Sequence, residues 1–287
     1  MKSNRATQEP RWVRYGLLTI GLGFLFFFLG LPLVAVFVEA LAQGWPAYVE
    51  ALKDSETRSA IWLTVVIALA VLPFNILFGV AAAWAIAKFD FRGKSLLITL
   101  IDLPFAVSPV VAGLIFILLF GAQGTFGPWL AANDVKIIFA VPGMILATLF
   151  ITFPFIAREL IPLMQAQGKD EEEAAVSLGA SGWQMFWRVT VPNIKWGLLY
   201  GVILSNARAM GEFGAVSVVS GHIRGETNTL PLHVEILYNE YNAVGAFAAA
   251  SILALLALVT LVAKTVVEWR MKKETDMLNT VLAPEKT

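Results

Sequence analysis

The most restrictive feature of this chain is a series of long apolar stretches, each able to cross a lipid bilayer as a helix. A spanning helix needs about 20 mostly apolar residues, and six stretches reach that length. None alternates apolar and polar residues as a membrane β-strand would, so helices fit the pattern better. The chain is also 58% hydrophobic and 15% charged, against about half and about a quarter in an ordinary soluble domain. We therefore expect an all-α integral membrane protein with six transmembrane helices, at residues 15–41, 60–87, 96–120, 137–164, 196–220 and 244–267.

Prolines interrupt most of these stretches. Proline is tolerated in a membrane helix when neighbouring groups satisfy the carbonyl that it leaves unpaired. We expect several of the helices to be kinked or broken, at or near Pro32, Pro73, Pro104, Pro109, Pro142, Pro154 and Pro162.

Charge and cysteine content exclude several classes of function. The formal net charge is zero, so no overall basic field favours nucleic acid as a partner. The chain has no cysteine, which excludes disulfides, zinc–thiolate sites and a cysteine nucleophile.

The basic residues predict the orientation in the membrane. Four of them precede the first apolar stretch, as in a signal peptide, but the stretch is too long for one and lacks a clear cleavage site, so we interpret it as a retained span. With the N-terminus inside, sixteen of the 21 Lys and Arg residues fall on the cytoplasmic side and four outside, while Arg208 lies within a span. The positive-inside rule then places both termini in the cytoplasm.

The longest cytoplasmic connection, residues 165–195, has the pattern of two short helices around a glycine turn. Asp170 with Glu173 forms one predicted capping box, and Ser181 with Gln184 forms a second. Gly179 is a typical helix terminator between them, and Pro192 is expected to stop the second helix before the fifth span. Because anionic lipid headgroups repel the acidic first helix, docking to a protein partner is favoured over resting on the membrane surface.

This loop resembles the signature of permease subunits of ATP-binding-cassette (ABC) importers. The signature is Glu-Ala-Ala, three residues, Gly, nine residues, Ile, one residue and Leu-Pro. The chain matches every spacing, with Val at the Ile and Leu positions. The resemblance implies a type I ABC importer permease fold, in which the loop is a coupling helix seated on a separate ATPase subunit; the matching residues are Glu173, Ala174, Ala175, Gly179 and Pro192.

Three further segments are similar to the sulfate/thiosulfate branch of that family, in particular to its W-type permease. They are residues 102–114, 207–221 and 225–242. Molybdate and tungstate permeases share the "GEFGA" element, so they remain an alternative. The resemblance implies four kinds of partner: a homologous T-type permease, two ATPase subunits, an extracytoplasmic sulfate-binding protein and the lipid bilayer of a bacterial inner membrane.

The chain itself carries no complete nucleotide-binding motif. "RGKS" at residues 92–95 has the end of a P-loop, but the required first glycine is replaced by Lys88. ATP and magnesium are therefore expected in the partner ATPase, with no cofactor in this chain. We divide the chain into cytoplasmic tails at 1–14 and 269–287 and one permease domain, 15–268, that carries the coupling loop.

Two ionisable residues inside the fifth span, Arg208 and Glu212, are candidates for the translocation path. A charge at the bilayer centre costs about 2.5–3.5 kcal/mol, and two residues four apart on a helix can pair to offset that cost. Ala207, Gly211 and Ala215 form an adjacent stripe of small residues that predicts close helix packing. A structural ion pair and an anion path past Arg208 both remain open interpretations.

Other polar residues in the spans are weaker candidates for the path. Ser108 lies between two prolines, and Asp102 precedes them in the same span. Ser205 is a further candidate, although a serine in a membrane helix more often bonds its own preceding turn. Asp102 is equally consistent with a position near the cytoplasmic interface.

The two histidines, His222 and His233, both fall in the last outer loop. A zinc site needs three or four close ligands, so we predict no metal site. Arg224 and Glu226 are expected at the rim that faces the binding protein, and residues 230–241 are expected to form a short helix against the bundle.

Two other classes of function were weighed. A standalone channel or proton-coupled carrier would show internal repeats or several intramembrane acids, and would not need the coupling loop. An intramembrane enzyme would need a nucleophile–base pair or a metal site in the spans, where no histidine or cysteine occurs.

Overall fold

The computed structural model describes the backbone of residues 11–282 and the side chains of residues 12–270. All regular structure in this range is helical. Of the two predicted tails, residues 1–10 and 283–287 lie outside the described residues. The last helix, α15 (Ala243–Leu282), continues well beyond residue 268.

The first two apolar stretches form long continuous helical runs. α1 (Arg11–Leu25), a π-helical turn η2 (Phe26–Gly30) and α2 (Leu31–Ala40) make one run, which the short α3 (Gly44–Lys53) links to α4 (Ser55–Lys88). Pro32 lies in the first turn of α2, and Pro73 lies inside α4 without ending it.

The third stretch is broken, as its prolines predicted. It forms α5 (Lys94–Ala106) and α6 (Pro109–Phe120), which meet at an angle of 107°. The residue before a proline is disfavoured in the helical conformation, and Ser108 accordingly has an extended backbone. α7 (Gly127–Ala132) follows, and then α8 (Val141–Thr152) and α9 (Pro154–Gln167) form the fourth stretch.

The second half begins with the loop of residues 165–195. It contains α10 (Asp170–Ser177), α11 (Gly182–Met185) and a π-helical turn η3 (Phe186–Thr190), which leads directly into α12 (Val191–Met210). The fifth stretch then ends in a separate short helix, α13 (Gly214–Ser220). The expected outer helix is α14 (Leu230–Asn239), which precedes α15.

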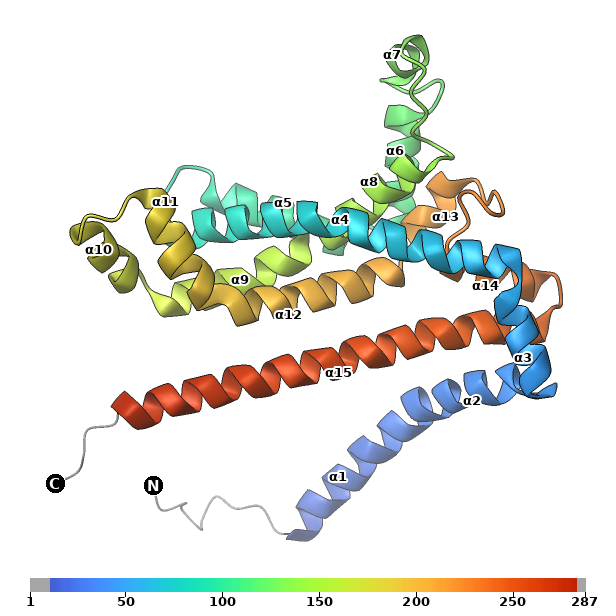
Figure 1. Ribbon diagram of the computed structural model, residues 1–287, viewed down its shortest axis with the longest axis horizontal. Helices are drawn as coiled ribbons and strands as arrows, with labels where there is room; N and C mark the ends of the chain where they lie inside the picture. The colour runs from blue at the N-terminus through green and yellow to red at the C-terminus, as the bar shows by residue number, and fades with distance from the viewer. Residues whose placement is uncertain (1–10, 283–287) are drawn as a thin grey trace.

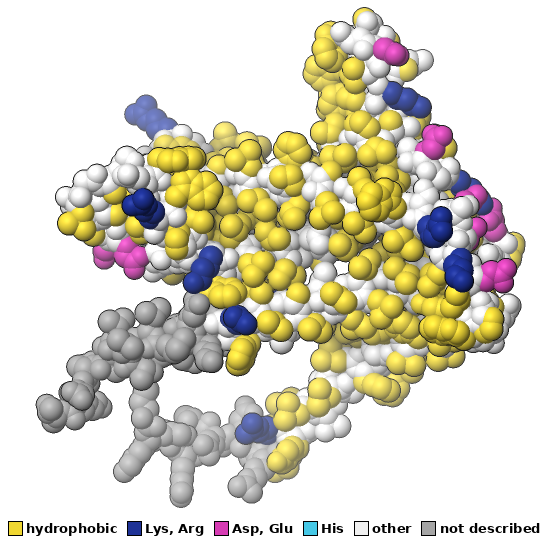
Figure 2. All heavy atoms as spheres, in the orientation of Figure 1, with side chains coloured by type: hydrophobic (Ala, Val, Ile, Leu, Met, Phe, Trp, Pro, Cys, Tyr) yellow, Lys and Arg dark blue, Asp and Glu magenta, His cyan; other side chains and the backbone are white. Residues whose placement is uncertain are grey.

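The long helices α4, α12 and α15 run side by side, with short helices at both ends (Figure 1). α10 and α11 lie at one end, α3 and α14 at the other, and α6 and α7 project from the bundle near that second end. In the space-filling view a broad apolar belt covers the middle of the molecule, and charged side chains gather mainly at its two ends (Figure 2). This distribution is that of a protein whose middle lies in lipid.

By length and composition, four helical segments in the described part of the chain can cross a membrane, or five if the bent pair α5–α6 is one span. The four are Trp12–Ala40, Ser55–Lys88, Val141–Gln167 and Ala243–Arg270. The remaining predicted stretch corresponds to α12 with α13, which is interrupted by polar residues. The chain is thus an all-α, multi-pass membrane protein.

The core of the bundle is held by close approach of three helices at Ile156 of α9. A methyl group added to Gly79 of α4 would lie 2.6 Å from the Ile156 side chain, and one added to Gly201 of α12 would lie 3.2 Å from its Cα. Small residues at such positions allow helix backbones to pack closely in a membrane. The predicted stripe of Ala207, Gly211 and Ala215 is not such a seam, because α12 ends at Met210.

A buried polar contact lies beside this core. Asn75 of α4 donates to Thr152 Oγ1 of α8 and to Ser205 Oγ of α12, both at 2.9 Å. All three residues are almost fully buried. Ser205 therefore bonds another helix and not its own preceding turn, which corrects the more common pattern that we weighed for it.

Candidate functional site

The loop of residues 165–195, which carries the signature, contains a short acidic helix. The first turn of α10 consists of Asp170 and the glutamates at 171–173, which suits the positive end of the helix dipole. The predicted capping box of Asp170 with Glu173 is wrong: the residue at the cap position is Lys169, no side chain caps the helix, and Asp170 is already helical. The prediction was off by one residue: a capping side chain must come from the residue before the first turn, and Asp170 already belongs to that turn.

The turn after α10 depends on Gly179. Its φ is +92°, a conformation that side-chain-bearing residues adopt only at a cost, and no atom lies within 4 Å of the position that a Cβ would take. Glycine is thus needed here for its backbone conformation and not for space. The predicted capping box of Ser181 and Gln184 follows and is confirmed, with bonds of 3.3 Å and 3.0 Å.

The prediction that Pro192 separates the second short helix from the fifth span is wrong. α11, η3 and α12 form one uninterrupted helical run, with Pro192 in the first turn of α12. Within this continuous run Pro192 cannot donate the usual backbone hydrogen bond, and the π-helical turn directly before it accommodates that loss. α11 and α12 are therefore parts of one continuous helical segment.

The outer surface of this loop is apolar and exposed. The side chains of Val176, Trp183 and Trp187 are more than half exposed, and Leu178 is 90% exposed. Glu173, Ala174 and Gly179 are also exposed, and Ala175 is half-buried. Glu173 makes no side-chain hydrogen bond or ion pair with the described residues. The matching residues of the signature thus lie on a surface that the chain itself does not cover.

Arg208 and Glu212 form the predicted ion pair, with 2.6 Å between Arg208 Nη2 and Glu212 Oε2. Glu212 lies beyond the end of α12 and is almost fully buried, whereas about a third of the Arg208 side chain is exposed. The other carboxylate oxygen of Glu212 accepts the N–H of Ala215 at 2.9 Å, in the first turn of α13. Glu212 therefore holds two helix segments together across the break.

This break lies against the break in the third span. A Cβ added to Gly214 would lie 2.9 Å from Pro109 Cβ, the residue that follows Ser108. Ser108 itself is exposed, and its hydroxyl does not cap α6. The two predicted path segments around Ser108 and Glu212 are thus neighbours.

Asp102 lies elsewhere on α5. Its carboxylate is 3.5 Å from Arg158 Nε of α9, and both side chains are about half exposed. Arg158 also lies over the ring of Phe105, 5.1 Å from its centroid. Asp102 is therefore part of a surface ion pair.

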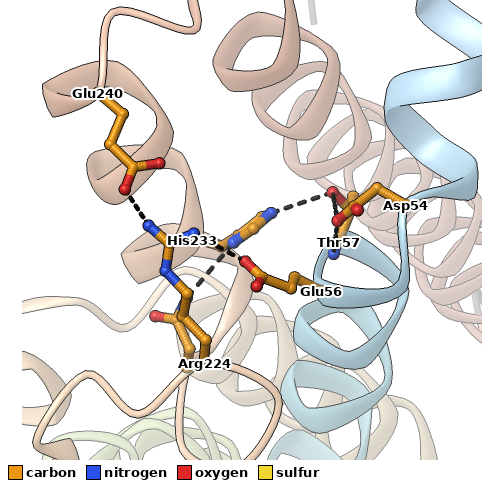
Figure 3. A network of polar contacts seen from close by, with 7 residues as sticks. Asp54, Glu56, Thr57, Arg224, His233 and Glu240 are labelled. Carbon is orange, nitrogen blue, oxygen red and sulfur yellow. Dashed lines mark hydrogen bonds and ion pairs between the residues drawn. The ribbon is translucent and has the colours of Figure 1, made fainter.

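The opposite end of the molecule carries a polar cluster that the sequence did not predict. Arg224 bridges Glu56 of α4, at 3.0 Å, and Glu240 after α14 (Figure 3). Beside it the buried His233 bonds Thr57 Oγ1 through Nε2, at 3.0 Å. Arg224, expected at the rim that faces the binding protein, is exposed and also pairs with two carboxylates of the same chain.

Titration in this cluster is governed by burial and by helix capping. Burial lowers the pKa of His233, although Glu56, Asp54 and Glu240 favour its protonated form. A hydrogen bond from the backbone N–H of Thr57 lowers the pKa of Asp54, which caps α4. Neither histidine belongs to a group of three or more metal-ligating side chains within the described residues.

Residues 75–273 match the family described as "Binding-protein-dependent transport system inner membrane component". The chain belongs to this family. It is 52% identical over 263 residues to the sulfate transport system permease protein CysW of Escherichia coli K12, covering 92% of this chain and 90% of that protein. It is 36% identical over 227 residues to the sulfate transport system permease protein CysT of the same strain, covering 78% and 82%.

A crystal structure of a bacterial alginate ABC transporter, in complex with an alginate pentasaccharide-bound periplasmic protein, has the same fold. Its TM-score is 0.75 at 18% identity, covering 91% of this chain and 96% of that one. The chain is therefore a permease subunit of an ABC transporter, a non-catalytic membrane component.

Besides the polar cluster around Arg224, two further features of the permease were missed from the sequence. Asn75 was detectable as a single amide in an otherwise apolar stretch, two residues after Pro73. The contact of Lys88 with Glu172 had no local signal, because 84 residues separate the two.

Proposed function

We propose that the chain is the W-type permease of an ATP-driven sulfate/thiosulfate importer. The observation that carries the proposal is the uncovered apolar surface of residues 170–187, which holds the Glu-Ala-Ala and Gly positions of the importer signature. Exposed Leu178, Trp183 and Trp187 would be covered by an ATPase subunit, and the acidic Glu173 would lie at that contact.

The names of the relatives support sulfate as the substrate. The similarity to CysW extends over about nine-tenths of both chains, so it includes the spans and the outer loops as well as the coupling loop. A sulfate dianion could cross only where the route is polar or hydrated, since a bare dianion in hydrocarbon would cost tens of kcal/mol. The neighbouring breaks at Ser108 and at Arg208–Glu212 are the candidate route, with Arg208 as its basic group.

The assembly would contain several chains. A homologous T-type permease would form the other half of the path, and two ATPase subunits would bind ATP and magnesium below it. An extracytoplasmic sulfate-binding protein would dock at the end of the molecule that carries α14. Both termini of this chain would be cytoplasmic, since the C-terminal end of α15 lies at the same end of the molecule as α10 and α11 (Figure 1).

Uptake of ³⁵S-labelled sulfate by cells that lack this chain tests the proposal. Restoring the chain should restore accumulation, an excess of unlabelled thiosulfate should compete, and molybdate should not. Copurification of an ATPase subunit with the chain in detergent tests the proposed coupling to an ATPase. Accumulation that molybdate suppresses, or a chain that purifies without an ATPase, would contradict the proposal.

A further inference from the structure

The inner side of α10 is fastened to the transmembrane helices by a buried charge pair. Lys88 is the last residue of α4, and only 8% of it is exposed. Its Nζ lies 3.3 Å from Glu172 Oε1 of α10 and donates to the carbonyl of Gly168, the residue that ends α9, at 2.5 Å. Lys88 thus contacts both the end of α9 and the coupling helix.

Glu172 extends this connection to the start of α12. The same oxygen, Oε1, accepts a hydrogen bond from Thr190 Oγ1 at 2.6 Å. Thr190 is buried and is the last residue of η3, immediately before α12. One carboxylate oxygen therefore joins the inner ends of two long membrane helices through α10.

Further contacts connect α4, α10 and the start of α12. Glu171 accepts a hydrogen bond from Asn193 of α12, and the rings of Trp84 on α4 and Phe186 in η3 lie 5.0 Å apart. A cavity next to the Lys88–Glu172 pair is lined by residues of α4, such as Trp84, and of α11, such as Met185. The connection is therefore formed by a small set of side chains around an incompletely filled space.

α10 has little else to hold it. None of its eight residues is buried, so no apolar side chain of this helix anchors it in the core. Its polar contacts with the rest of the chain come from Glu171 and Glu172, and the exposed Glu173 lines the cavity beside them. A buried ion pair suits this role because each charge depends on the other. Loss of either partner leaves the remaining charge buried without compensation.

We propose that Lys88 and Glu172 form the mechanical link through which the coupling helix displaces α4, with Thr190 carrying the same displacement to α12. Lys88 is then a positioning residue for transport. The inference rests on the proposed function, since it specifies how a force applied to the exposed side of α10 enters the spans.

The test uses the assembled complex in lipid vesicles with a sulfate-binding protein and ³⁵S-labelled sulfate. Lys88→Met keeps the length of the side chain and removes its charge, and Glu172→Gln keeps an acceptor for Thr190. Lys94→Met is the matched control, because Lys94 also ends at a carboxylate at this edge, 3.1 Å from Asp90, in an exposed pair. The double variant Lys88→Glu with Glu172→Lys restores the pair with reversed charges.

Three quantities are measured: copurified ATPase subunit, ATP hydrolysis and sulfate uptake. For Lys88→Met and Glu172→Gln we expect normal copurification, hydrolysis within twofold of the wild type and uptake at least tenfold lower. More ATP is then consumed for each sulfate transported. The charge-reversed double variant should recover at least a third of wild-type uptake, and Lys94→Met should equal the wild type.

Two results would overturn the inference while leaving the proposed function intact. One is uptake by Lys88→Met within twofold of the wild type. The other is loss of copurified ATPase in both single variants without recovery in the double variant, which would assign the pair to the folding of the loop alone. If the wild-type complex accumulates no sulfate, the proposed function itself fails.

Discussion

The two ends of this permease use their polar and apolar side chains in opposite ways. At the end with α14, Arg224, Glu56 and His233 are engaged with partners in the same chain. At the end with α10, the apolar side chains of Leu178 and Trp183 are left exposed. The first end has polar side chains paired within the chain, whereas the second leaves apolar side chains that the chain does not cover. Substitutions at the first end should therefore change stability, and substitutions at the second should change transport.

The largest effect is expected from His233→Ala, at the end with α14, where polar side chains have partners within the chain. His233 is fully buried, so the change leaves a cavity and removes one of the two side-chain partners of Thr57 Oγ1. We expect a loss of about 2–4 kcal/mol in the free energy of unfolding, measured by thermal or denaturant unfolding in detergent. Uptake per folded complex should stay near the wild-type value.

The other histidine supplies the control for this change. His222 is partly exposed, and its contact with Glu235 is 3.6 Å long. Its φ is +54°, so His222→Asn is the suitable variant, because asparagine tolerates that conformation. It should alter the unfolding free energy by less than about 0.5 kcal/mol. Equal losses for both histidine variants would contradict the contrast between a buried and a partly exposed histidine.

At the opposite end, Gly179→Val should reduce sulfate uptake at least tenfold while leaving the transmembrane bundle folded. Valine is strained at a φ of +92°, so the turn between α10 and α11 must change and the exposed surface loses its shape. Gly182→Ala is the control, since Gly182 has open space around it and no positive φ. Similar uptake by the two glycine variants would argue against a role for the turn.

Between the two ends, Arg208→Ala should lower sulfate uptake about fivefold, or about 1 kcal/mol, without loss of assembly. The expected reason is removal of the basic group at the break, and uptake together with copurification of the partner chains measures it. Arg208→Lys, which keeps the charge, should recover much of the activity. Unchanged uptake by Arg208→Ala would leave the ion pair with Glu212 a purely structural role.

The smallest effect concerns pH. Because burial lowers the pKa of His233 in the folded chain, the unfolded chain binds its proton first as the pH falls. Stability is therefore full above about pH 6.5 and declines below it, by at most about 0.8 kcal/mol between pH 7.5 and pH 6.0. Asp54, whose pKa is lowered by its cap hydrogen bond, does not titrate in this window. Unfolding midpoints of the wild type and His233→Phe at both pH values measure the difference, and an equal pH dependence in both would exclude His233 as its source.

The sequence predicted the features that depend on neighbouring residues. Apolar length predicted the helical spans, the prolines around Ser108 predicted the break in the third one, and Ser181 with Gln184 predicted the start of α11. Those signals need only a few consecutive residues. The assignment of residues 1–14, 15–268 and 269–287 to tails and domain stays a prediction.

Features that depend on register or on distant residues could not be predicted in this way. Pro192 was interpreted as a stop because the sequence does not reveal the π-helical turn that places it in the first turn of α12. The contacts of Asn75 with Thr152 and Ser205 join three separate helices, so they exist only once the bundle has packed. Arg208 and Glu212, the candidate path residues, form the predicted ion pair, but the sequence did not reveal that Glu212 lies beyond the end of α12 and accepts the N–H of Ala215 in α13.

The close packing around Ile156 limits how this permease can change conformation. Gly79 of α4 and Gly201 of α12 both face Ile156: a methyl group at Gly79 would overlap its side chain, and one at Gly201 would lie in tight contact with its Cα. Sliding α4 or α12 along α9 would drive those backbones into the isoleucine. A displacement of any one of the three helices should therefore move all three together as a rigid unit. Alternation between inward-facing and outward-facing states would then arise at the contacts of this chain with its neighbours.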